Sequence, residues 1–498
     1  MTQDFTEQNR TLTLGRSVNL DFTTTEVNKV AYDKGFYIAF KEAGFDSVRF
    51  FFRQGWDPKI HKVAVDDALE LGLKVVIVPF SMYCWGKESL VHWWGEVAEY
   101  YKDYPADLIF EVINEPKMAG HPDGKEAETM EWYSACIQEV RRSNPARLLA
   151  VGGPHFNGVK LLTEYVTPEY LSYKLKDGSG FCDDPNIWGV FHCYHPRGFT
   201  HGAKDQDINR DHPGWREEIL ADLEEASAWS RKYDKRVYLS EWGSRVNHEV
   251  KHVEEYTAFV VPELSKRSIE WSYYCGLFSN AWPYGLYNSE WGFEGVEGVV
   301  KNLTGKEPPK EVPSTNQIVN SDFQLDLADW NSSKYVIKGT ADGQGVGGSR
   351  AIRVHVPFVP MDTFDPEMKR KKTPSLYQQY EPDWQFRAMG INHANKYTIQ
   401  LRRSNIYKIS FFAKCEVGQA RLQIQLGHAP DNELVIWTSE EITVHSELKQ
   451  YELKYSHSID SVRNVRFSFN FLDRHSEIIL DQIEFRGRRP NLEENIHE

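Results

Sequence analysis

The chain contains no long apolar run. A membrane-spanning helix needs about 20 consecutive apolar residues, and a secretory leader needs a basic start followed by a shorter apolar stretch. The first residues, MTQDFTEQNRTLTLGRS, have neither feature. We therefore expect no membrane partner. We expect a cytoplasmic location if the chain is complete, and a secreted protein if a leader has been removed.

Cysteine is scarce. Six of the 498 residues are cysteine, and none forms a CxxC pair or a spacing typical of zinc ligands. Most lie in or beside apolar or aromatic runs, which favours small buried side chains. The six are Cys84, Cys136, Cys182, Cys193, Cys275 and Cys415.

Positive charge is also in deficit. Lys and Arg number 58 against 72 Asp and Glu, which gives a formal net charge of -14. Binding to nucleic acid and to anionic membranes draws on Lys and Arg, so this balance argues against both as partners and favours a neutral ligand. Aromatic residues are abundant instead, with 15 Trp, 25 Tyr and 27 Phe. Their flat rings suit stacking on ligands as well as burial in a core.

Short β-branched runs alternate with longer amphipathic stretches from about residue 12 to residue 300. The predicted strands are 12–20, 47–52, 74–79, 108–113, 148–151, 187–192, 236–241 and 269–274. Between them, stretches such as 31–43, 88–102, 126–142 and 216–232 have the apolar spacing of amphipathic helices. This α/β pattern predicts one (β/α)8 TIM barrel, whose functional site lies at the C-terminal ends of the strands.

The periodicity changes after residue 305. Residues 306–315, KEPPKEVPST, are rich in Pro and charge and are predicted to link a barrel domain, 1–305, to a second domain, 316–488. In the second domain, short alternating runs predict an all-β sandwich. The runs are 350–356, 397–401, 407–413, 420–426, 452–455, 465–471 and 478–485. Residues 489–498 are expected to be a C-terminal tail.

Two glutamates stand at the ends of predicted strands. Glu115 follows the fourth strand in LIFEVINEP, and Glu241 ends the seventh in RVYLSEWG. These strands face each other across a barrel, so the two carboxyls can flank one glycosidic bond. A retaining mechanism needs carboxyls about 5 to 5.5 Å apart, one protonated and one ionised. NEP alone is also typical of a helix N-terminus, where Asn caps and Pro follows. The presence of a second glutamate at the end of the seventh strand favours a catalytic role over a helix N-terminus.

Residues 12–300 resemble glycoside hydrolase family 5, the cellulase and mannanase family of clan A. The resemblance is carried by KEAGFDSVRF, EYYKDYPADLIFEVINEP, LAVGGPHFN, FHCYHP and VYLSEWGS, in the order and at the spacing of that family. It implies that Glu115 is the general acid/base and Glu241 the nucleophile. It implies no cofactor, and no metal in the catalytic site, because two-carboxylate chemistry needs none.

The resemblance also implies roles for four polar residues. Asn114 would donate to the 2-hydroxyl of the reacting sugar. Arg49, at the end of the second strand, would hold Glu241 ionised, because a nearby guanidinium lowers the pKa of a carboxyl. His192 and Tyr194 occupy the H-x-Y positions of the family, with Tyr194 hydrogen-bonded to Glu241 and His192 lining the same subsite. The alternative for these four is that they are ordinary polar residues satisfied at strand ends.

Two positions depart from the family pattern. GLKVVIVPFSMYCWG places Phe80 and Ser81 where the family has histidine at the end of strand three, which alters the pocket and leaves the substrate open. The strand-eight tryptophan that forms the sugar platform aligns with Trp271, or with Trp282 in the following loop. Placement on the strand favours Trp271.

Other features concern the shape of the cleft. Trp56 and Trp85 follow strands two and three, so they are candidate cleft walls or side chains packed under loops. The stretches 167–186 and 196–213 are long for connections in a barrel, and long loops tend to be functional. We expect them to wall one end of the cleft and to favour short or branched oligosaccharides.

The C-terminal segment resembles carbohydrate-binding modules of the β-sandwich type through IVNSDFQLDLADW, NIYKISFFAKCE and EIILDQIEFRG. Trp330, Trp384 and Trp437 are candidates for a sugar-stacking face or for the core. Asp481 is a candidate ligand of a structural calcium, as in several such modules. A domain of this fold can also serve only to brace the barrel.

These features predict a retaining β-glycoside hydrolase that cleaves a β-linked glucan or a related polysaccharide or oligosaccharide by double displacement. One alternative is an exo-acting β-glycosidase or mannanase of the same family. The other is a carbohydrate-binding pseudoenzyme, which has the fold without turnover.

Overall fold

The computed structural model describes the greater part of the chain. The described residues are 9, 11–20, 32–53, 58–80, 86–116, 125–202, 205–245, 248–277, 285–287, 292–310, 316–318, 323, 330–332, 336–357, 364–365, 370–371, 374–378, 399–428, 435–473 and 475–488. None of the helices in these ranges is long and apolar enough to cross a membrane.

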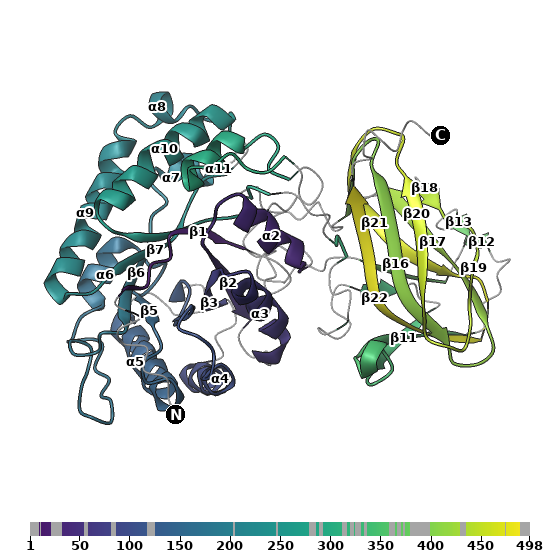
Figure 1. Ribbon diagram of the computed structural model, residues 1–498, viewed down its shortest axis with the longest axis horizontal. Helices are drawn as coiled ribbons and strands as arrows, with labels where there is room; N and C mark the ends of the chain where they lie inside the picture. Colours follow the sequence, from purple (N-terminus) through teal and green to yellow (C-terminus); the bar gives the residue numbers. More distant parts are fainter. Residues whose placement is uncertain are drawn as a thin grey trace.

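Eight parallel strands close into a barrel in the order β1 to β8 (Figure 1). Closure comes from β1, where Ser17 lies opposite Ser47 of β2 on one side and Ser272 of β8 on the other. The strands are β1 (Arg16–Asn19), β2 (Ser47–Arg53), β3 (Lys74–Phe80), β4 (Leu108–Glu111), β5 (Leu149–Gly152), β6 (Ile187–His192), β7 (Val237–Trp242) and β8 (Glu270–Tyr273). The predicted TIM barrel is confirmed, and each strand overlaps its predicted run.

Helices cover the outside of the barrel. They are α2 (Lys34–Glu42), α3 (Lys62–Glu70), α4 (Lys87–Tyr100), α5 (Glu126–Ser143), α6 (Val159–Tyr165), α7 (Arg197–His201), α8 (Ile208–Asp211), α9 (Trp215–Tyr233), α10 (Val250–Lys266) and α11 (Glu297–Thr304), with a 3-10 turn η1 (Pro58–His61). The apolar periodicity explains their placement. In α4, for example, Leu90, Trp94 and Ala98 recur every four residues on the buried face.

Two layers of side chains fill the barrel interior. The layer nearer the N-terminal ends is mainly apolar and includes Leu14, Val76, Ile109, Ala150 and Val190. Five other inward-facing positions are polar or charged and fully buried: Asn19, Arg49, Glu111, Ser240 and Ser272. Because inward and outward side chains alternate along each strand, this second layer lies directly above the apolar one. Charged groups are thereby gathered at the C-terminal end of the barrel.

Antiparallel sheets form the C-terminal region. One has the strand order β10-β11-β22-β16-β20, another has the order β18-β17-β21-β14-β9 with β15 beside β21 and β19 beside β17, and β12 pairs with β13. The bounds are β9 (Trp330–Ser332), β10 (Ile337–Ala341), β11 (Ala351–Val356), β12 (Phe364–Asp365), β13 (Arg370–Lys371), β14 (Ser375–Gln378), β15 (Ile399–Leu401), β16 (Ile406–Cys415), β17 (Ala420–His428), β18 (Val435–Thr438), β19 (Ile442–Val444), β20 (Lys449–Ser456), β21 (Val462–Phe471) and β22 (Ser476–Arg488). The two larger sheets share one core, in which the rings of Phe411 and Phe469 lie 5.1 Å apart. This arrangement agrees with the predicted sandwich.

The carboxylate of Asp33 contacts both the barrel and the C-terminal region. Asp33 caps α2, where its Oδ1 accepts a hydrogen bond from Gly35 N at 2.7 Å. Its Oδ2 accepts from Asn316 N at 3.2 Å and pairs with Arg486 of β22 at 2.5 Å. Figure 1 shows α2 on the side of the barrel next to these sheets. The exact domain boundaries stay predictions, and residues 311–315 of the predicted linker and the tail 489–498 lie outside the described residues.

The cysteines follow the prediction with one exception. Those that are buried as expected are Cys136, Cys193, Cys275 and Cys415. Cys182 is exposed, because it lies in a turn between α6 and β6 rather than in an apolar element. Cys84 lies outside the described residues.

Candidate active site

Glu115 and Glu241 lie together at the C-terminal end of the barrel. Glu241 is in β7, and Glu115 follows the end of β4 in a turn with a φ of 41°. Non-glycine residues seldom adopt this left-handed region, so the surrounding contacts must hold the turn. One oxygen of each carboxyl and one nitrogen of His192 all lie within 4.8 Å of one another. The two carboxyls are therefore close enough to act on one bond.

Glu241 is held by two donors, one on each oxygen. Arg49 Nη1 donates to Oε1 at 2.9 Å, and the Tyr194 hydroxyl donates to Oε2 at 3.0 Å. Burial alone would raise the pKa of Glu241, but the charge of His192 in its protonated form, the charge of Arg49 and the hydrogen bonds from Arg49 and Tyr194 outweigh burial and lower it. Glu241 is therefore the carboxyl that stays ionised.

Glu115 has the opposite environment. Its Oε1 lies 3.0 Å from Nδ1 of His192. Burial raises the pKa of Glu115, and the negative charge of Glu241 raises it further, although the hydrogen bond to His192 opposes the shift. Two carboxyls whose environments push their pKa values apart are suited to acid and base roles. Of the two carboxyls, Glu115 is therefore the one that holds a proton more readily.

Arg49 lies between these groups with an acceptor for each of the five donors that a guanidinium offers. Its Nε and Nη2 donate to the two oxygens of Glu111 at 2.7 and 2.8 Å. The second Nη2 hydrogen goes to Asn114 Oδ1 at 2.8 Å. Nη1 donates to Asn19 Oδ1 at 2.6 Å and to Glu241. Burial opposes the charge, but Glu111 and Glu241 outweigh it and raise the pKa of Arg49.

His192 connects Glu115 to the buried carboxylate of Glu111. Its Nε2 lies 3.0 Å from the Ser240 hydroxyl, which donates to Glu111 Oε1 at 3.3 Å. A hydroxyl has one hydrogen, so this pattern requires His192 to carry a hydrogen on Nε2. When the ring is neutral, Nδ1 is then an acceptor for the proton of Glu115. Burial would lower the pKa of His192, but Glu241 and Glu115 outweigh burial and raise it.

Trp271 does not reach the carboxyls, contrary to the prediction. Its neighbour Ser272 points into the barrel, where its hydroxyl lies 2.5 Å from that of Ser17 and 2.6 Å from that of Tyr238. Successive side chains on a strand point to opposite faces. Trp271 therefore points outward and packs 5.7 Å from the ring of Trp242, in the core between the strands and the helices.

Tyr274 is the strand-eight aromatic residue that lies beside the site. It directly follows β8, and its ring lies 6.5 Å from the ring of Tyr194, which contacts Glu241. Among the other residues singled out, those outside the described ranges are Trp282, Trp56, Trp85 and Ser81. Phe80 ends β3, and its side chain is not described.

Three residues of the site were not predicted from the sequence: Asn19, Glu111 and Ser240. Each lies on the inner face of the barrel at or near the end of a strand, and each contacts Arg49 or His192. A signal was present for Glu111, which is a charged residue inside the otherwise apolar run LIFEVI. A charge that is retained inside a fully buried strand needs a partner. A charged partner for Glu111 could therefore have been expected, although the closed barrel decides that this partner is Arg49.

Glu115, His192 and Glu241 could together supply three metal ligands. Both oxygens of Glu241 are already occupied by donors, one of which is the charged Arg49. A guanidinium at 2.9 Å from a ligand oxygen repels a cation at that oxygen. These contacts suit proton transfer and nucleophilic attack better than metal binding, and the predicted absence of a cofactor stays a prediction.

One of the two long connections lies at the wrong end of the barrel to wall the cleft. Residues 167–186 follow α6 and precede β6, so they run past the N-terminal ends of the strands. The prediction assigned them by length alone and ignored their place in the order of strands and helices. Residues 196–213 follow β6 and contain α7 and α8, so they do lie at the catalytic end.

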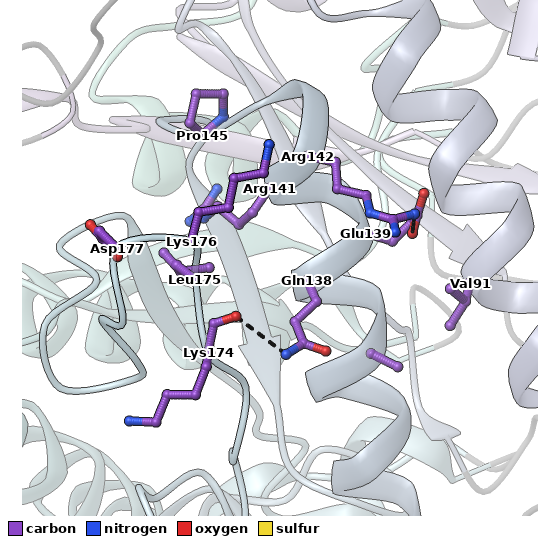
Figure 2. Close-up of a pocket in the computed structure, with 11 residues that line it drawn as sticks. Val91, Gln138, Glu139, Arg141, Arg142, Pro145, Lys174, Leu175, Lys176 and Asp177 are labelled. Atoms are coloured by element: carbon purple, nitrogen blue, oxygen red, sulfur yellow. Dashed lines mark hydrogen bonds and ion pairs between the residues drawn. The ribbon is translucent and has the colours of Figure 1, made fainter.

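A pocket of about 600 Å³ opens on the outer, helical side of the barrel. Figure 2 shows it between α5 and residues 174–177, with Arg141 and Arg142 among the side chains that line it. Arg141 is bound to Asp184 and to backbone carbonyls, and Arg142 is bound to Glu139. The pocket includes neither Glu115 nor Glu241, and the guanidinium groups of Arg141 and Arg142 are already paired.

In the C-terminal sandwich, Trp330 belongs to the core. It is 1% exposed and packs 5.5 Å from the ring of Phe323, so it cannot stack on a sugar. Trp437 is half-buried, with its ring 5.0 Å from that of Tyr455. Trp384 lies outside the described residues.

Asp481 is buried at a bulge of β22, where its carboxylate accepts three hydrogen bonds. Oδ2 accepts from Val346 N at 2.8 Å and from the Ser349 hydroxyl at 2.9 Å, and Oδ1 accepts from Gln482 N at 2.8 Å. These contacts tie the turn before β11 to β22. The structural calcium stays a prediction.

A closed barrel with paired glutamates at the ends of β4 and β7 defines the class of barrel glycoside hydrolases. Residues 34–277 match the family model described as cellulase, glycosyl hydrolase family 5. This part of the chain therefore belongs to glycosyl hydrolase family 5.

Two curated relatives match shorter stretches. "Endoglucanase H" of Acetivibrio thermocellus is 31% identical over 108 residues, which are 22% of this chain and 10% of that protein. "Endoglucanase A" of Ruminococcus albus is 33% identical over 110 residues, which are 22% of this chain and 29% of that protein. The matched stretch is thus less than a third of either relative. A solved structure of endoglucanase Cel5A from Thermotoga maritima covers 60% of this chain and 100% of its own, with 24% identity and a TM-score of 0.48.

Proposed function

We propose that this protein is a retaining β-glycoside hydrolase that cleaves a β-linked glucan or a related oligosaccharide. The observation that carries the proposal is the pair Glu115 and Glu241. Their carboxyl oxygens approach within 4.8 Å, and their surroundings raise the pKa of one and lower the pKa of the other. A separation of about 5 Å leaves no room for a water molecule between carboxylate and sugar, which favours direct attack over inversion.

In the first step, Glu241 attacks the anomeric carbon while Glu115 donates its proton to the departing oxygen. A covalent glycosyl-enzyme forms, and the aglycone leaves. In the second step, Glu115 takes a proton from water, which attacks the same carbon and releases Glu241. Arg49 and Tyr194 keep Glu241 ionised and oriented for the attack.

The substrate class rests on the matched relatives and on the charge of the chain. Two matched relatives are named endoglucanases, which favours a β-linked glucan. The net charge of -14 suits a neutral polysaccharide better than an acidic one. Residues 196–213 at the catalytic end favour a cleft closed on one side, so short oligosaccharides and exo action stay within the proposal.

The test is a panel of aryl β-glycosides and of β-1,4-, β-1,3- and mixed-linked oligosaccharides, including mannan fragments. Products are followed by chromatography, and the anomeric proton of the first product is followed by NMR. We expect cleavage in which the β-anomer appears first and the α-anomer only later, by mutarotation. An α-anomer released first would rule out the retaining mechanism. Binding without cleavage across the panel would identify a pseudoenzyme.

We expect Tyr274, and not Trp271, to support the reacting sugar. Tyr274→Ala removes a ring beside Tyr194 and should lower kcat/KM by roughly 10- to 100-fold, whereas Tyr274→Phe retains the ring and much of the activity. Trp271→Phe should lower the thermal stability through lost packing and leave kcat/KM within about 2-fold. Steady-state kinetics and thermal unfolding of the three variants check this. An activity loss for Trp271→Phe as large as that for Tyr274→Ala would contradict the assignment.

A further inference from the structure

Glu111 is a third carboxylate in the active site, and the double displacement described above does not use it. It ends β4, is fully buried, and lies beneath Glu115 and Glu241 in the polar layer of the barrel. A buried ionised carboxylate costs free energy unless charge and hydrogen bonds compensate it. Its contacts therefore indicate what it does.

On one side, Glu111 binds Arg49 through both of its oxygens, at 2.7 and 2.8 Å. This two-point contact fixes the plane of the guanidinium. In this orientation Nη1 of Arg49 donates to Glu241 Oε1, and the second hydrogen of Nη2 is donated to Asn114 Oδ1. The residue that holds the nucleophile is thus itself held by Glu111.

On the other side, Glu111 accepts a hydrogen bond from Ser240, and Ser240 in turn faces Nε2 of His192. The negative charge at the end of this chain keeps the serine hydrogen pointed toward Glu111. The Ser240 oxygen is then an acceptor, so the neutral His192 ring must carry its hydrogen on Nε2. Nδ1, 3.0 Å from Glu115 Oε1, is left as an acceptor for the acid proton.

We propose that Glu111 is a positioning residue that acts on both catalytic carboxyls, through Arg49 on Glu241 and through Ser240 and His192 on Glu115. The inference rests on the proposed function, because it assigns a role within that mechanism. Glu111 does not touch the substrate. It sets the direction of the hydrogen bonds that keep the acid protonated and the nucleophile ionised before the substrate binds.

The charged groups around Glu111 decide whether its replacement raises or lowers the pKa values of Glu115 and Glu241. The titratable and charged side chains facing it are Arg49, Glu115, His192, Tyr194, Tyr238 and Glu241. Replacing Glu111 by Gln removes a negative charge, and Arg49 is then less compensated. Both Glu241 and Glu115 should ionise more easily, so both limbs of the pH profile of kcat/KM should move to lower pH.

The first experiment compares Glu111→Gln, Ser240→Ala and a matched control, Glu270→Gln. Glu270 is also a strand glutamate, in a partly buried ion pair with Arg236, but it lies at the N-terminal end of the barrel, where it also accepts from Leu14 N. We expect Glu111→Gln to move both limbs down by about one pH unit and to lower kcat roughly 10- to 100-fold. Ser240→Ala removes only the hydrogen-bond path from Glu111 to His192 and leaves the contact of Glu111 with Arg49. It should therefore move the alkaline limb alone. Glu270→Gln should lower the melting temperature and leave both limbs in place.

The second readout does not need turnover. The ring ¹⁵N shifts of His192, assigned by the signal that disappears in His192→Gln, report which nitrogen carries the hydrogen. We expect the Nε2–H form in the wild type and a mixture with the Nδ1–H form in Ser240→Ala and Glu111→Gln.

The two readouts separate the possible failures. If the wild type is inactive across the substrate panel, the proposed function fails, and the ¹⁵N shifts still test the inference. If the wild type is active but the variants leave both limbs and the His192 tautomer unchanged, Glu111 is only structural. If Glu111→Gln does not fold, Ser240→Ala decides through the alkaline limb and the tautomer.

Discussion

Glu241→Gln is expected to lower kcat/KM on an aryl β-glycoside by more than about 10⁴-fold, because no neutral amide can form the glycosyl-enzyme. The substitution nearly preserves the shape of the side chain, so Arg49 and Tyr194 can still surround it. Circular dichroism and the melting temperature should therefore stay close to the wild type. The rate is measured with a chromogenic leaving group, for which a loss this large remains detectable.

The control for this variant is Glu96→Gln, which makes the same chemical change at an exposed position of α4. It should leave kcat/KM within about 2-fold of the wild type.

A sharper test uses Glu241→Ala with azide, which can enter the space left by the side chain and attack the anomeric carbon from the same face. The product should be the α-glycosyl azide. Residual turnover of Glu241→Gln near the wild-type rate would exclude Glu241 as the nucleophile.

Glu115→Ala is expected to show a loss that depends on the leaving group. Poor leaving groups need the proton of Glu115, so their kcat/KM should fall by roughly 10²- to 10⁴-fold, whereas a dinitrophenolate departs without protonation and should lose far less. The second step still lacks its base, so the glycosyl-enzyme should accumulate as a burst. Azide should rescue this step and give the β-glycosyl azide, the opposite anomer to that formed by Glu241→Ala.

The pH profile of the same variant gives an independent check. In the wild type, kcat/KM should fall at low pH as Glu241 takes up a proton and at high pH as Glu115 loses its proton. The lowered pKa of Glu241 and the raised pKa of Glu115 keep these limbs apart. Glu115→Ala should retain the acid limb and lose the alkaline one on a dinitrophenyl glycoside. A persistent alkaline limb would assign it to another group, with His192 the first to test.

Much of the barrel follows from the sequence, because each strand is a short apolar run and each helix has a clear apolar stripe. The run 187–192 coincides with β6, and Glu115 and Glu241 follow from their places at the ends of β4 and β7. In the C-terminal region, strands such as β9 and β19 were missed, since three residues are too few for an alternation to register.

The residues around the glutamates were harder to predict. Trp271 was chosen because it is the tryptophan on strand eight, yet the direction of a side chain depends on register, and one residue changes the face. The inward placement of Ser272 decides against it. Glu111 was passed over because a charge inside LIFEVI has no visible partner in the sequence. Its partner, Arg49, is 62 residues earlier and becomes adjacent only when the barrel closes.

All hydrogen-bond donors of Arg49 are in use, and this limits which mutations the site can accept. Every hydrogen of the guanidinium has its own acceptor, on Asn19, Glu111, Asn114 or Glu241. Loss of any one acceptor leaves an unpaired donor in a buried place, at a cost of about 1–3 kcal/mol. Single substitutions at any of these positions are therefore expected to destabilise the same buried cluster. A residue that supports a sugar by stacking needs only a flat ring, so it can be replaced more easily. Proteins that share the Arg49 cluster can therefore differ in the sugars that they accept.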